Sequence, residues 1–462
     1  MKQELFSHYF KEKKVTKMGL GPNGRSYGDT VFLVKQGAHV LVTDHRDDSD
    51  VLASKERLLK ELTTKEQKNI SFILGEHREQ DFIDCDFVLK ASGVPLDNKY
   101  IQAANNAGVP VHTSSAWLFS IISELLPDVQ TIGITGTKGK STVTDMIEHI
   151  LKENNVAYHV AGNVRGVANL PVLSKITSGD VILAELDSWQ LQGFGEAHIS
   201  PHISVFTNFF EDHLNYYKGS MQAYFKDKAY IYAFQKDLDI CFVSKQAYGE
   251  IKKFENTIPE SIIDVATNIL PTDLELQVLG EHNRENAALA FSVVQQLGIE
   301  TKDILVSLGT YKSMVGRLKY LGKIKEIHYY DDNNSTTPTS TIKSLEAVKD
   351  KHPDSEIIWL GGGADKEFDY SELGEVLPQF ITKGVMFTGA ATNKIIDAVP
   401  DVLIDTLFVV NSMQEAWDYA QQNIKPGSVV VLSPAAASFG VFLNEYERGD
   451  KFNELVKNIS TN

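Results

Sequence analysis

The stretch that most constrains the fold of this chain runs from Gln130 to Thr144 and reads Q-T-I-G-I-T-G-T-K-G-K-S-T-V-T. An apolar, strand-like run leads into a glycine-rich turn, and Val143 to Leu151 follow the pattern of an amphipathic helix. Strand, glycine turn, Lys-Ser and helix are typical of a phosphate-binding loop, because backbone N–H groups and the helix N-terminus converge on phosphate oxygens. In such a loop Lys140 neutralises the outer phosphates and a hydroxyl can bind Mg²⁺. We therefore predict an ATP site here.

The glycine spacing departs from the usual G-x-x-x-x-G-K-[ST] pattern. The first glycine of that pattern would fall at Ile134, whereas the chain carries Gly133, Gly136 and Gly139. An ordinary glycine-containing turn between strand and helix is the alternative. The strand-to-helix context favours the phosphate site.

Composition indicates a globular protein of several domains. At 462 residues, and with about 150 residues per domain, three domains are expected. The formal net charge of −16 argues against broad nucleic-acid binding, which needs a basic face. Only Cys85 and Cys241 occur, so a disulfide framework is excluded and a reducing cytoplasm is the expected location. Because the start lacks a signal-peptide core and no apolar run approaches the ~18 residues of a membrane span, we expect no membrane association.

The first segment, residues 1–112, alternates short apolar runs with helical stretches, as βα units do. The strand-like Val15–Met18 leads into Gly19–Gly24, whose sequence G-L-G-P-N-G matches G-x-G-x-x-G, and the next strand-like run ends at Asp44. An acidic residue about 20 positions after such a turn can accept a hydrogen bond from a ribose hydroxyl. This motif is compatible with three alternatives: a dinucleotide site, a site for another nucleotide, or a plain βαβ turn. A ligand could also sit at Ser92–Gly93, where a later strand ends.

The second segment, residues 113–312, contains the phosphate loop and places further polar residues after strands. Glu185 follows the run V-I-L-A, and F-F-E-D leads to His213 just beyond another buried strand. The carboxyl ends of parallel strands meet at one edge, so both side chains would lie near the phosphate loop. A helix cap is the alternative for Glu185, but beside a phosphate loop a Mg²⁺ role gains weight. Lys228 lies in a helical stretch where composition alone indicates a solvated lysine.

A later helix of this segment begins at E-H-N-R-E-N. Its first turn contains His282, Asn283 and Asn286, and we expect these polar side chains to face outward. Simple N-capping is the alternative reading.

The third segment, residues 313–462, again alternates strands and helices and predicts a third parallel sheet. Gly361 to Lys366 resembles another phosphate-approach turn, although glycine turns after strands are common. The three segments look like similar α/β layers rather than sequence repeats.

In this order, the motifs of the chain resemble those of the Mur ligases, the ATP-dependent peptide-forming enzymes of peptidoglycan precursor synthesis. The motifs are G-I-T-G-T-K-G-K-S-T at 133–142, G-N-V at 162–164, E-L-D-S-W-Q-L at 185–191, F-T-N-F-F-E-D-H-L at 206–214, E-H-N-R-E-N-A-A at 281–288, G-R-L at 316–318 and L-S-P-A-A-A-S-F at 432–439. Within the family, the chain most resembles the MurD type. The resemblance implies an α/β fold of three domains: a Rossmann-like UDP-binding domain (1–112), a central P-loop ATPase-type domain (113–312), and a Rossmann-like ligase domain (313–462) that binds the amino acid and closes on ATP.

The activity implied by the resemblance is ATP-dependent addition of D-glutamate to UDP-N-acetylmuramoyl-L-alanine through an acyl phosphate, by a cytoplasmic monomer that uses ATP and Mg²⁺. The implied catalytic residues are Lys140, Glu185, His213 and Lys228. The implied Mg²⁺ ligands are Ser141, Glu185, His213 and Lys228 in its N-carboxylated (carbamylated) form. The implied ATP-binding residues are Gly136, Thr137, Lys138, Gly139, Lys140, Ser141, Thr142, Asn283, Arg317 and Asp332. The implied substrate-binding residues are Pro22, Asn23, Gly24, Asp44, His45, Arg46, Gly93, Asn163, His213, Thr336, Lys366, Ser438 and Phe439.

The chain departs from the family pattern at a few positions. Asn334 stands where the third-domain motif N-D-S-K-A-T-N has its lysine, and Asp187 and Trp189 alter the pattern E-L-S-S-F-Q-L. A related ligase for L-glutamate, a folylpolyglutamate-synthase-like ligase and a non-catalytic ATP-binding subunit are therefore the alternatives. Folate-type enzymes lack the N-terminal glycine-turn domain. A pure binder has no need of a carboxylatable lysine at position 228.

Overall fold

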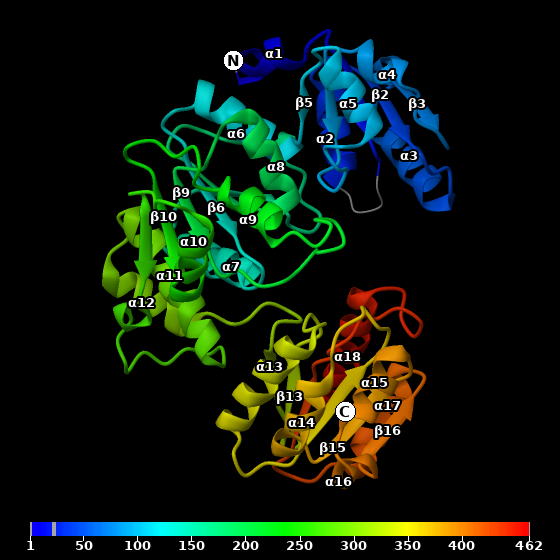
Figure 1. Ribbon diagram of the computed structural model, residues 1–462, viewed down its shortest axis with the longest axis vertical. Helices are drawn as coiled ribbons and strands as arrows, with labels where there is room; N and C mark the ends of the chain where they lie inside the picture. Colours follow the sequence, from blue (N-terminus) through cyan, green and yellow to red (C-terminus); the bar gives the residue numbers. More distant parts are fainter. Residues whose placement is uncertain (1, 21–24, 462) are drawn as a thin grey trace. The chain divides into compact units, whose positions relative to one another are not determined.

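The computed structural model describes residues 2–20 and 25–461, which divide into two compact units (Figure 1). The first unit comprises Met1–Ile269 and Ala288–Ile304, and the second comprises Leu270–Ala287 and Leu305–Asn462. The first unit contains a five-stranded and a six-stranded sheet, and the second contains another six-stranded sheet. The predicted α/β architecture built on three sheets is confirmed. The domain boundaries predicted after residues 112 and 312 stay predictions.

The N-terminal sheet is parallel, with the strand order β3-β2-β1-β4-β5. The chain moves outward from β1 to β3 and then returns to the other side of β1 with β4. The strand order therefore reverses between β1 and β4, and in open α/β sheets ligands bind at the carboxyl ends of strands at such a switch point. The elements are α1 (Lys2–Phe10), β1 (Lys14–Met18), α2 (Arg25–Lys35), β2 (His39–Asp44), α3 (Ser49–Glu61), η1 (Glu66–Asn69), β3 (Ile70–Leu74), α4 (Gln80–Ile83), β4 (Phe87–Lys90), α5 (Lys99–Asn106) and β5 (Val111–His112).

The central sheet is also parallel, with the order β11-β10-β9-β6-β8-β7. β6 lies between β9 and β8, and these three strands are almost entirely buried, which explains their continuous apolar sequences. The elements are α6 (Ser114–Leu125), β6 (Gln130–Thr135), α7 (Lys140–Glu153), β7 (Tyr158–Gly162), η2 (Leu170–Ser174), β8 (Val181–Glu185), α8 (Ser188–Ala197), β9 (Ile203–Phe206), α9 (Met221–Ala229), β10 (Ile240–Ser244), α10 (Lys245–Phe254), β11 (Ile262–Val265), η3 (Thr267–Ile269), α11 (Glu281–Gln296) and α12 (Thr301–Thr310).

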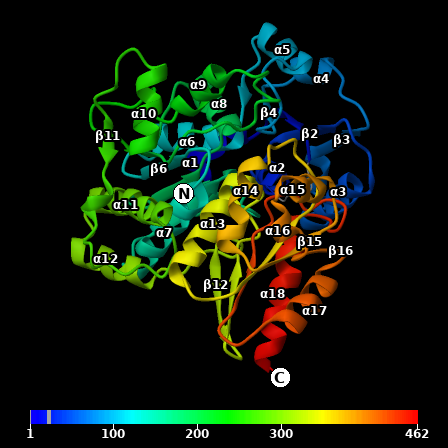
Figure 2. The same cartoon turned by 60° about the horizontal axis from the view of Figure 1, so that its bottom comes forward.

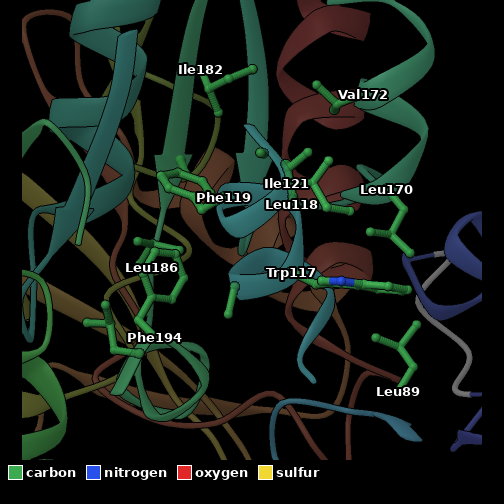
Figure 3. Packing of buried hydrophobic residues seen from close by; sticks show 14 of the residues in the cluster. Leu89, Trp117, Leu118, Phe119, Ile121, Leu170, Val172, Ile182, Leu186 and Phe194 are labelled. Atoms are coloured by element: carbon green, nitrogen blue, oxygen red, sulfur yellow. The ribbon is translucent and has the colours of Figure 1, made fainter. Parts of the chain in front are cut away.

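One hydrophobic core joins the two sheets of the first unit (Figure 3). Leu89 of β4 and Ile182 of β8 belong to the same cluster, and Trp117 and Phe119 of α6 fill the space between them. Trp117 makes an edge contact with Phe87 at a ring-centroid distance of 4.4 Å. The two sheets of the first unit therefore share one hydrophobic core.

The sheet of the second unit has the order β12-β13-β17-β14-β15-β16 and is covered on both faces. Helices α13, α14 and α15 pack on one face through a core that includes Trp359, and α17 and α18 lie side by side on the other (Figure 2). The elements are β12 (Lys319–Ile324), β13 (Ile327–Asp331), α13 (Pro338–Lys351), β14 (Ile357–Gly362), α14 (Ser371–Phe380), β15 (Lys383–Phe387), α15 (Ala390–Ala398), α16 (Asp401–Ile404), β16 (Leu407–Val410), α17 (Met413–Asn423), β17 (Val429–Leu432) and α18 (Glu445–Thr461).

One edge of this third sheet differs from the predicted parallel arrangement. β12 pairs antiparallel with β13 through a two-residue turn at Lys325 and Glu326, whose φ values are 49° and 65°. Two consecutive left-handed residues form the turn that suits a twisted hairpin, but Asn, Asp or Gly usually occupy it. Lys-Glu therefore gave no turn signal in the sequence.

Within the part of the chain that the structure describes, no helix combines the length and the apolarity needed to cross a membrane.

Candidate active site

The glycine turn after β6 forms a compact loop from Gly136 to Gly139. These two glycines have φ values of 142° and 82°, which L side chains rarely adopt. The N–H groups of Thr137 and Lys138 donate to the main-chain and side-chain oxygens of Asn208, each at 2.8 Å. Asn208 follows β9, so the loop is held against the neighbouring strand, and α7 begins directly after it. The loop thus ends at a helix N-terminus, which is the geometry of an anion site.

Alanine at Gly136 is expected to weaken ADP binding by about tenfold or more. A Cβ at this position would lie 1.9 Å from Thr207 Oγ1 and 3.0 Å from Asn208 N, so the loop must shift. Isothermal titration calorimetry with ADP measures the effect. Gly249→Ala on α10 is the matched control, because its added Cβ meets nothing within 4 Å. Equal ADP affinity of Gly136→Ala and wild type would contradict the assignment of this loop to a nucleotide.

Two lysine side chains meet at one carbonyl oxygen of the loop. Lys140 Nζ donates to Gly136 O and Thr137 O, at 3.0 Å each. Lys228 Nζ, from α9, donates to the same Gly136 O at 2.8 Å and to Thr135 Oγ1 at 3.4 Å. Lys228 is only 2% exposed. The structure therefore brings Lys228 to the phosphate-type loop, although composition alone indicates a surface lysine.

Burial lowers the pKa of Lys228 well below its ordinary value, and the nearby charge of Lys140 lowers it further. The carboxylates of Asp187, Asp212 and Glu185 act in the opposite direction. A lysine in this state has a larger fraction of neutral amine near neutral pH. Only the neutral amine reacts with carbon dioxide to form a carbamate, so a lowered pKa meets one requirement of that modification.

Glu185 and Asn163 meet at the same edge of the sheet. Glu185 is the last residue of β8 and is 7% exposed. Gly162, the last residue of β7, pairs with it, and a Cβ on Gly162 would lie 2.0 Å from Glu185 O. The close approach lets the Asn163 N–H donate to Glu185 O at 2.6 Å.

His213 lies within electrostatic reach of both lysines. Its backbone is left-handed (φ 54°), and its N–H donates to Asp212 Oδ1 at 2.9 Å. Burial lowers the pKa of His213; Asp212 opposes this, while Lys228 and Lys140 lower it further. The ring lies 4.8 Å from that of Trp189, centroid to centroid. His213 is thus a neutral imidazole at neutral pH, with a ring nitrogen able to accept.

The predicted Mg²⁺ ligands supply a hydroxyl from Ser141, a carboxylate from Glu185, an imidazole from His213 and the modified Lys228. Among the described residues, no group of three or more His, Cys, Asp or Glu could hold a metal ion. The predicted set contains only two residues of those types. Mg²⁺ prefers oxygen ligands, and an ammonium at Lys228 would repel it. The donor chemistry therefore fits Mg²⁺ on the condition that Lys228 carries a carbamate.

The described residues that are predicted for UDP lie at the carboxyl edge of the N-terminal sheet. Asp44 ends β2, and its two carboxylate oxygens accept from Leu20 N and Arg46 N at 3.0 Å each. His45 is exposed, and Gly93 is exposed in the loop after β4. A Cβ at Gly93 would lie 3.9 Å from the indole of Trp189. Three further predicted residues, Pro22, Asn23 and Gly24, lie outside the described residues.

In the second unit, the loops that carry predicted residues follow three adjacent strands, β13, β17 and β14. Ala435 N donates to Ser335 O at 2.8 Å, and Ala364 and Ala437 exchange backbone hydrogen bonds of 3.0 and 3.1 Å. These bonds join the three loops into one surface. The predicted residues on these loops are Asp332, Thr336, Lys366, Ser438 and Phe439.

Asp332 is buried, and its carboxylate holds the residues around it through hydrogen bonds. Its carboxylate accepts from Leu318 N at 3.0 Å and from Ser433 Oγ at 2.7 Å. Burial raises the pKa of Asp332 to about 6. Because Arg317 precedes Leu318 in the chain, this carboxylate also fixes the backbone beside Arg317. The structure therefore brings Arg317 and Asp332 together.

At the start of α11, His282 is exposed as expected, but the two asparagines do not face outward. Asn283 and Asn286 are buried, and Asn286 Nδ2 donates to Asn283 Oδ1 at 3.3 Å. Asn283 Nδ2 donates to Leu279 O at 2.7 Å. The Asn283 amide thus links Asn286 to the turn that precedes the helix.

Sequence reasoning missed Arg448 of α18, which is fully buried. Its guanidinium donates to Asn333 Oδ1 at 2.7 Å, Asn333 O at 3.0 Å and Ala436 O at 3.2 Å. It therefore connects the loop after β13 to the loop after β17. A signal was available, because Arg448, Phe452 and Val456 are spaced by four residues and share one apolar helix face.

Comparison with known proteins places similar sequences along nearly the whole chain. Three family descriptions match: "Mur ligase MurD-like, N-terminal domain" at residues 13–113, "Mur ligase middle domain" at 134–269, and "Mur ligase, glutamate ligase domain" at 316–436. The UDP-N-acetylmuramoylalanine--D-glutamate ligase of Roseiflexus sp. (strain RS-1) is 30% identical over 482 residues, covering 97% of this chain and 99% of its own. The protein of the same name from Borreliella burgdorferi (strain ZS7) is 29% identical over 463 residues, covering 96% and 97%. The crystal structure of MurF ligase from Thermotoga maritima in complex with ADP shares the fold, with a TM-score of 0.59 at 15% identity, over 98% of this chain and 97% of that one.

Proposed function

The chain belongs to the Mur ligase family, and we propose that it joins D-glutamate to UDP-N-acetylmuramoyl-L-alanine with cleavage of ATP. Relatives of nearly the same length carry the name of a D-glutamate ligase. The observation that carries the proposal is the edge of the central sheet, where Lys140 and Lys228 share the carbonyl of Gly136 beside Glu185 and His213. The product is a precursor of peptidoglycan, and we place the enzyme in the cytoplasm as a monomer.

Joining a carboxylate to an amine requires that a carboxylate oxygen become a leaving group. Transfer of the γ-phosphoryl group of ATP to the alanyl carboxylate gives an acyl phosphate and ADP. The amine of D-glutamate then attacks the acyl carbon, a tetrahedral intermediate forms, and inorganic phosphate leaves. The protein's task is to align the groups, balance the phosphate charge and exclude water from the acyl phosphate.

The loop after β6 would bind the triphosphate. The N–H groups of the first turn of α7, at Ser141 and Thr142, would donate to phosphate oxygens at the helix N-terminus. Lys140 would exchange its bonds to Gly136 O and Thr137 O for bonds to the outer phosphates. Such an exchange keeps the ammonium hydrogen-bonded both with and without the nucleotide.

Carbamylated Lys228 would hold Mg²⁺ together with Ser141, Glu185 and His213. The ion, when bound, supplies positive charge to the phosphate oxygens and the developing leaving group. His213 would serve as a neutral ligand, because burial and the charge of Lys140 lower its pKa. Asn163, held beside Glu185, would contact the muramoyl group at the same edge.

The remaining residues divide between nucleotide and amino-acid binding. We propose that the uridine and diphosphate groups bind at the edge of the N-terminal sheet, through Pro22, Asn23, Gly24, Asp44, His45, Arg46 and Gly93. In the second unit we assign the adenine nucleotide to Asn283, Arg317 and Asp332. We assign the incoming amino acid to Thr336, Lys366, Ser438 and Phe439.

L-glutamate is the second candidate acceptor, because Asn334 stands where the family motif has a lysine. The Asn334 N–H donates to Gly316 O at 2.9 Å, and its amide lies where a Cβ on Gly316 would touch it at 3.1 Å. The residue therefore helps to shape the turn at Gly316 and offers no positive charge to a carboxylate.

Phosphate release by the purified chain tests the proposal. We expect release that requires ATP, UDP-N-acetylmuramoyl-L-alanine and D-glutamate together, with the dipeptidyl product seen by mass spectrometry. Replacing D- with L-glutamate should abolish the signal. Faster product formation with L-glutamate would transfer the assignment to the second candidate, and release without either substrate would contradict ligase chemistry.

A further inference from the structure

Lys90 occupies the switch point of the N-terminal sheet. It is the last residue of β4 and pairs with Met18, the last residue of the neighbouring strand β1. The strand order reverses between these two strands. Crevices at the carboxyl ends of such strands are where nucleotides bind in open α/β sheets. None of the residues assigned above to UDP supplies a buried cation at this position.

The ammonium of Lys90 is buried and bonded only to neutral oxygens among the described residues. The side chain is 3% exposed, and Nζ donates to Val94 O at 2.9 Å and to Ser92 O at 3.3 Å. No described carboxylate lies within 4.0 Å of it. Burial lowers the pKa of Lys90 to about 8, while Asp187, Glu196 and Asp227 act on it through space in the opposite direction. A buried cation without a paired anion is costly, and an anionic ligand removes that cost.

The turn that Lys90 supports has its own unused donors. Ala91 N donates to Met18 O at 3.2 Å and Val94 N donates to Ala91 O at 3.0 Å, which closes the turn. The N–H groups of Ser92 and Gly93, which lie between Ala91 and Val94 in the chain, donate to no acceptor among the described residues. Because Lys90 holds the carbonyls of Ser92 and Val94 on its own side, the turn can offer these N–H groups to an anion. Gly93 is exposed, so a ligand can reach the turn.

We infer that Lys90 is the positioning residue for the diphosphate of the uridine-linked substrate: it fixes the Ser92–Val94 turn and places a positive charge behind it. This inference rests on the proposed function, which supplies the nucleotide. Selection between a nucleoside diphosphate and a bare nucleoside at this site would then depend on Lys90. A lysine of purely structural importance would affect both ligands equally.

Calorimetric titration of the full chain with UDP and with uridine tests the inference. Wild type should bind UDP more tightly than uridine. Lys90→Met should weaken UDP binding by about ten- to a hundredfold, the range expected for hydrogen bonds and charge at a buried site, with uridine affinity nearly unchanged. Lys90→Gln separates the two roles, because its amide can still donate to the turn but carries no charge. It should lose a large part of the preference for UDP while retaining the thermal stability of the wild type.

Lys60→Met is the matched control, because Lys60 is an exposed lysine of α3, beside the same sheet. This variant should keep the wild-type preference for UDP over uridine. If Lys90→Gln keeps the wild-type ratio of UDP to uridine affinity, the inference is wrong while the proposed function stands. Equal affinity of wild type for UDP and uridine would also overturn it. Wild type that binds neither ligand would contradict the proposed function itself. Should Lys90→Met unfold, Lys90→Gln still decides, because its amide keeps a donor for the turn.

Discussion

Lys228→Ala is expected to lower the rate of ligation by about a hundredfold or more, the loss typical of removing a metal ligand or a charge-stabilising group. The side chain is buried against the phosphate-type loop and reaches the same carbonyl as Lys140. Its removal deletes the carbamate oxygens from the set that would hold Mg²⁺ and leaves a cavity beside Gly136. Phosphate release with saturating ATP, UDP-N-acetylmuramoyl-L-alanine and D-glutamate measures the loss.

Partial rescue distinguishes a carbamate from a structural lysine. Short carboxylic acids such as acetate should restore a fraction of the Lys228→Ala rate, because they place a carboxylate in the vacated space. Lys226→Ala is the matched control, since Lys226 lies two residues away on α9 and is exposed. It should retain wild-type activity. Full activity of Lys228→Ala without added acid would remove this residue from the site.

The phosphate loop could be predicted because all of its determinants are contiguous. Strand, glycine turn, lysine and helix follow one another between Gln130 and Glu153, and each is encoded by local pattern and by glycine's access to left-handed φ. The same holds for Glu185, since a residue at the end of a buried parallel strand must emerge at the ligand edge. The architecture could be predicted from the alternation of apolar runs and helical stretches for the same reason.

Contacts between distant residues could not be predicted from pattern. Lys228 Nζ bonds to an oxygen 92 positions away in the chain, and nothing near Lys228 distinguishes it from a solvated lysine. Only the family resemblance singled it out. The buried pairing of Asn283 with Asn286 likewise depends on the turn at Leu279, which the helix pattern does not describe. The burial of Lys90 also depends on the folded turn around it, which the strand pattern does not describe.

The second large effect is expected at Arg448, where replacement by methionine should destabilise the second unit by about 3–5 kcal/mol. The variant loses three hydrogen bonds from a charged donor and leaves the oxygens of Asn333 and Ala436 buried without a partner. Because methionine fills part of the volume of the arginine, the loss of stability comes mainly from the lost hydrogen bonds and less from poorer packing. For a unit of this size the unfolding midpoint should fall by roughly 10 °C. Calorimetry of the full chain measures it, and Lys451→Met is the control, because Lys451 is an exposed partner of Glu447 on the same helix and such pairs contribute little.

Arg448→Met should also weaken the binding of D-glutamate. Arg448 joins the loop after β13, which carries Thr336, to the loop after β17, which carries Ser438, so its loss should separate the two groups assigned to the amino acid. We expect a KM for D-glutamate raised by about tenfold or more at a temperature where the variant is folded. Arg448→Lys keeps one charged donor but not the planar fork, and its KM should lie between those of wild type and Arg448→Met. If Arg448→Met melts as wild type does and keeps its KM for D-glutamate, the guanidinium neither stabilises this unit nor positions its loops.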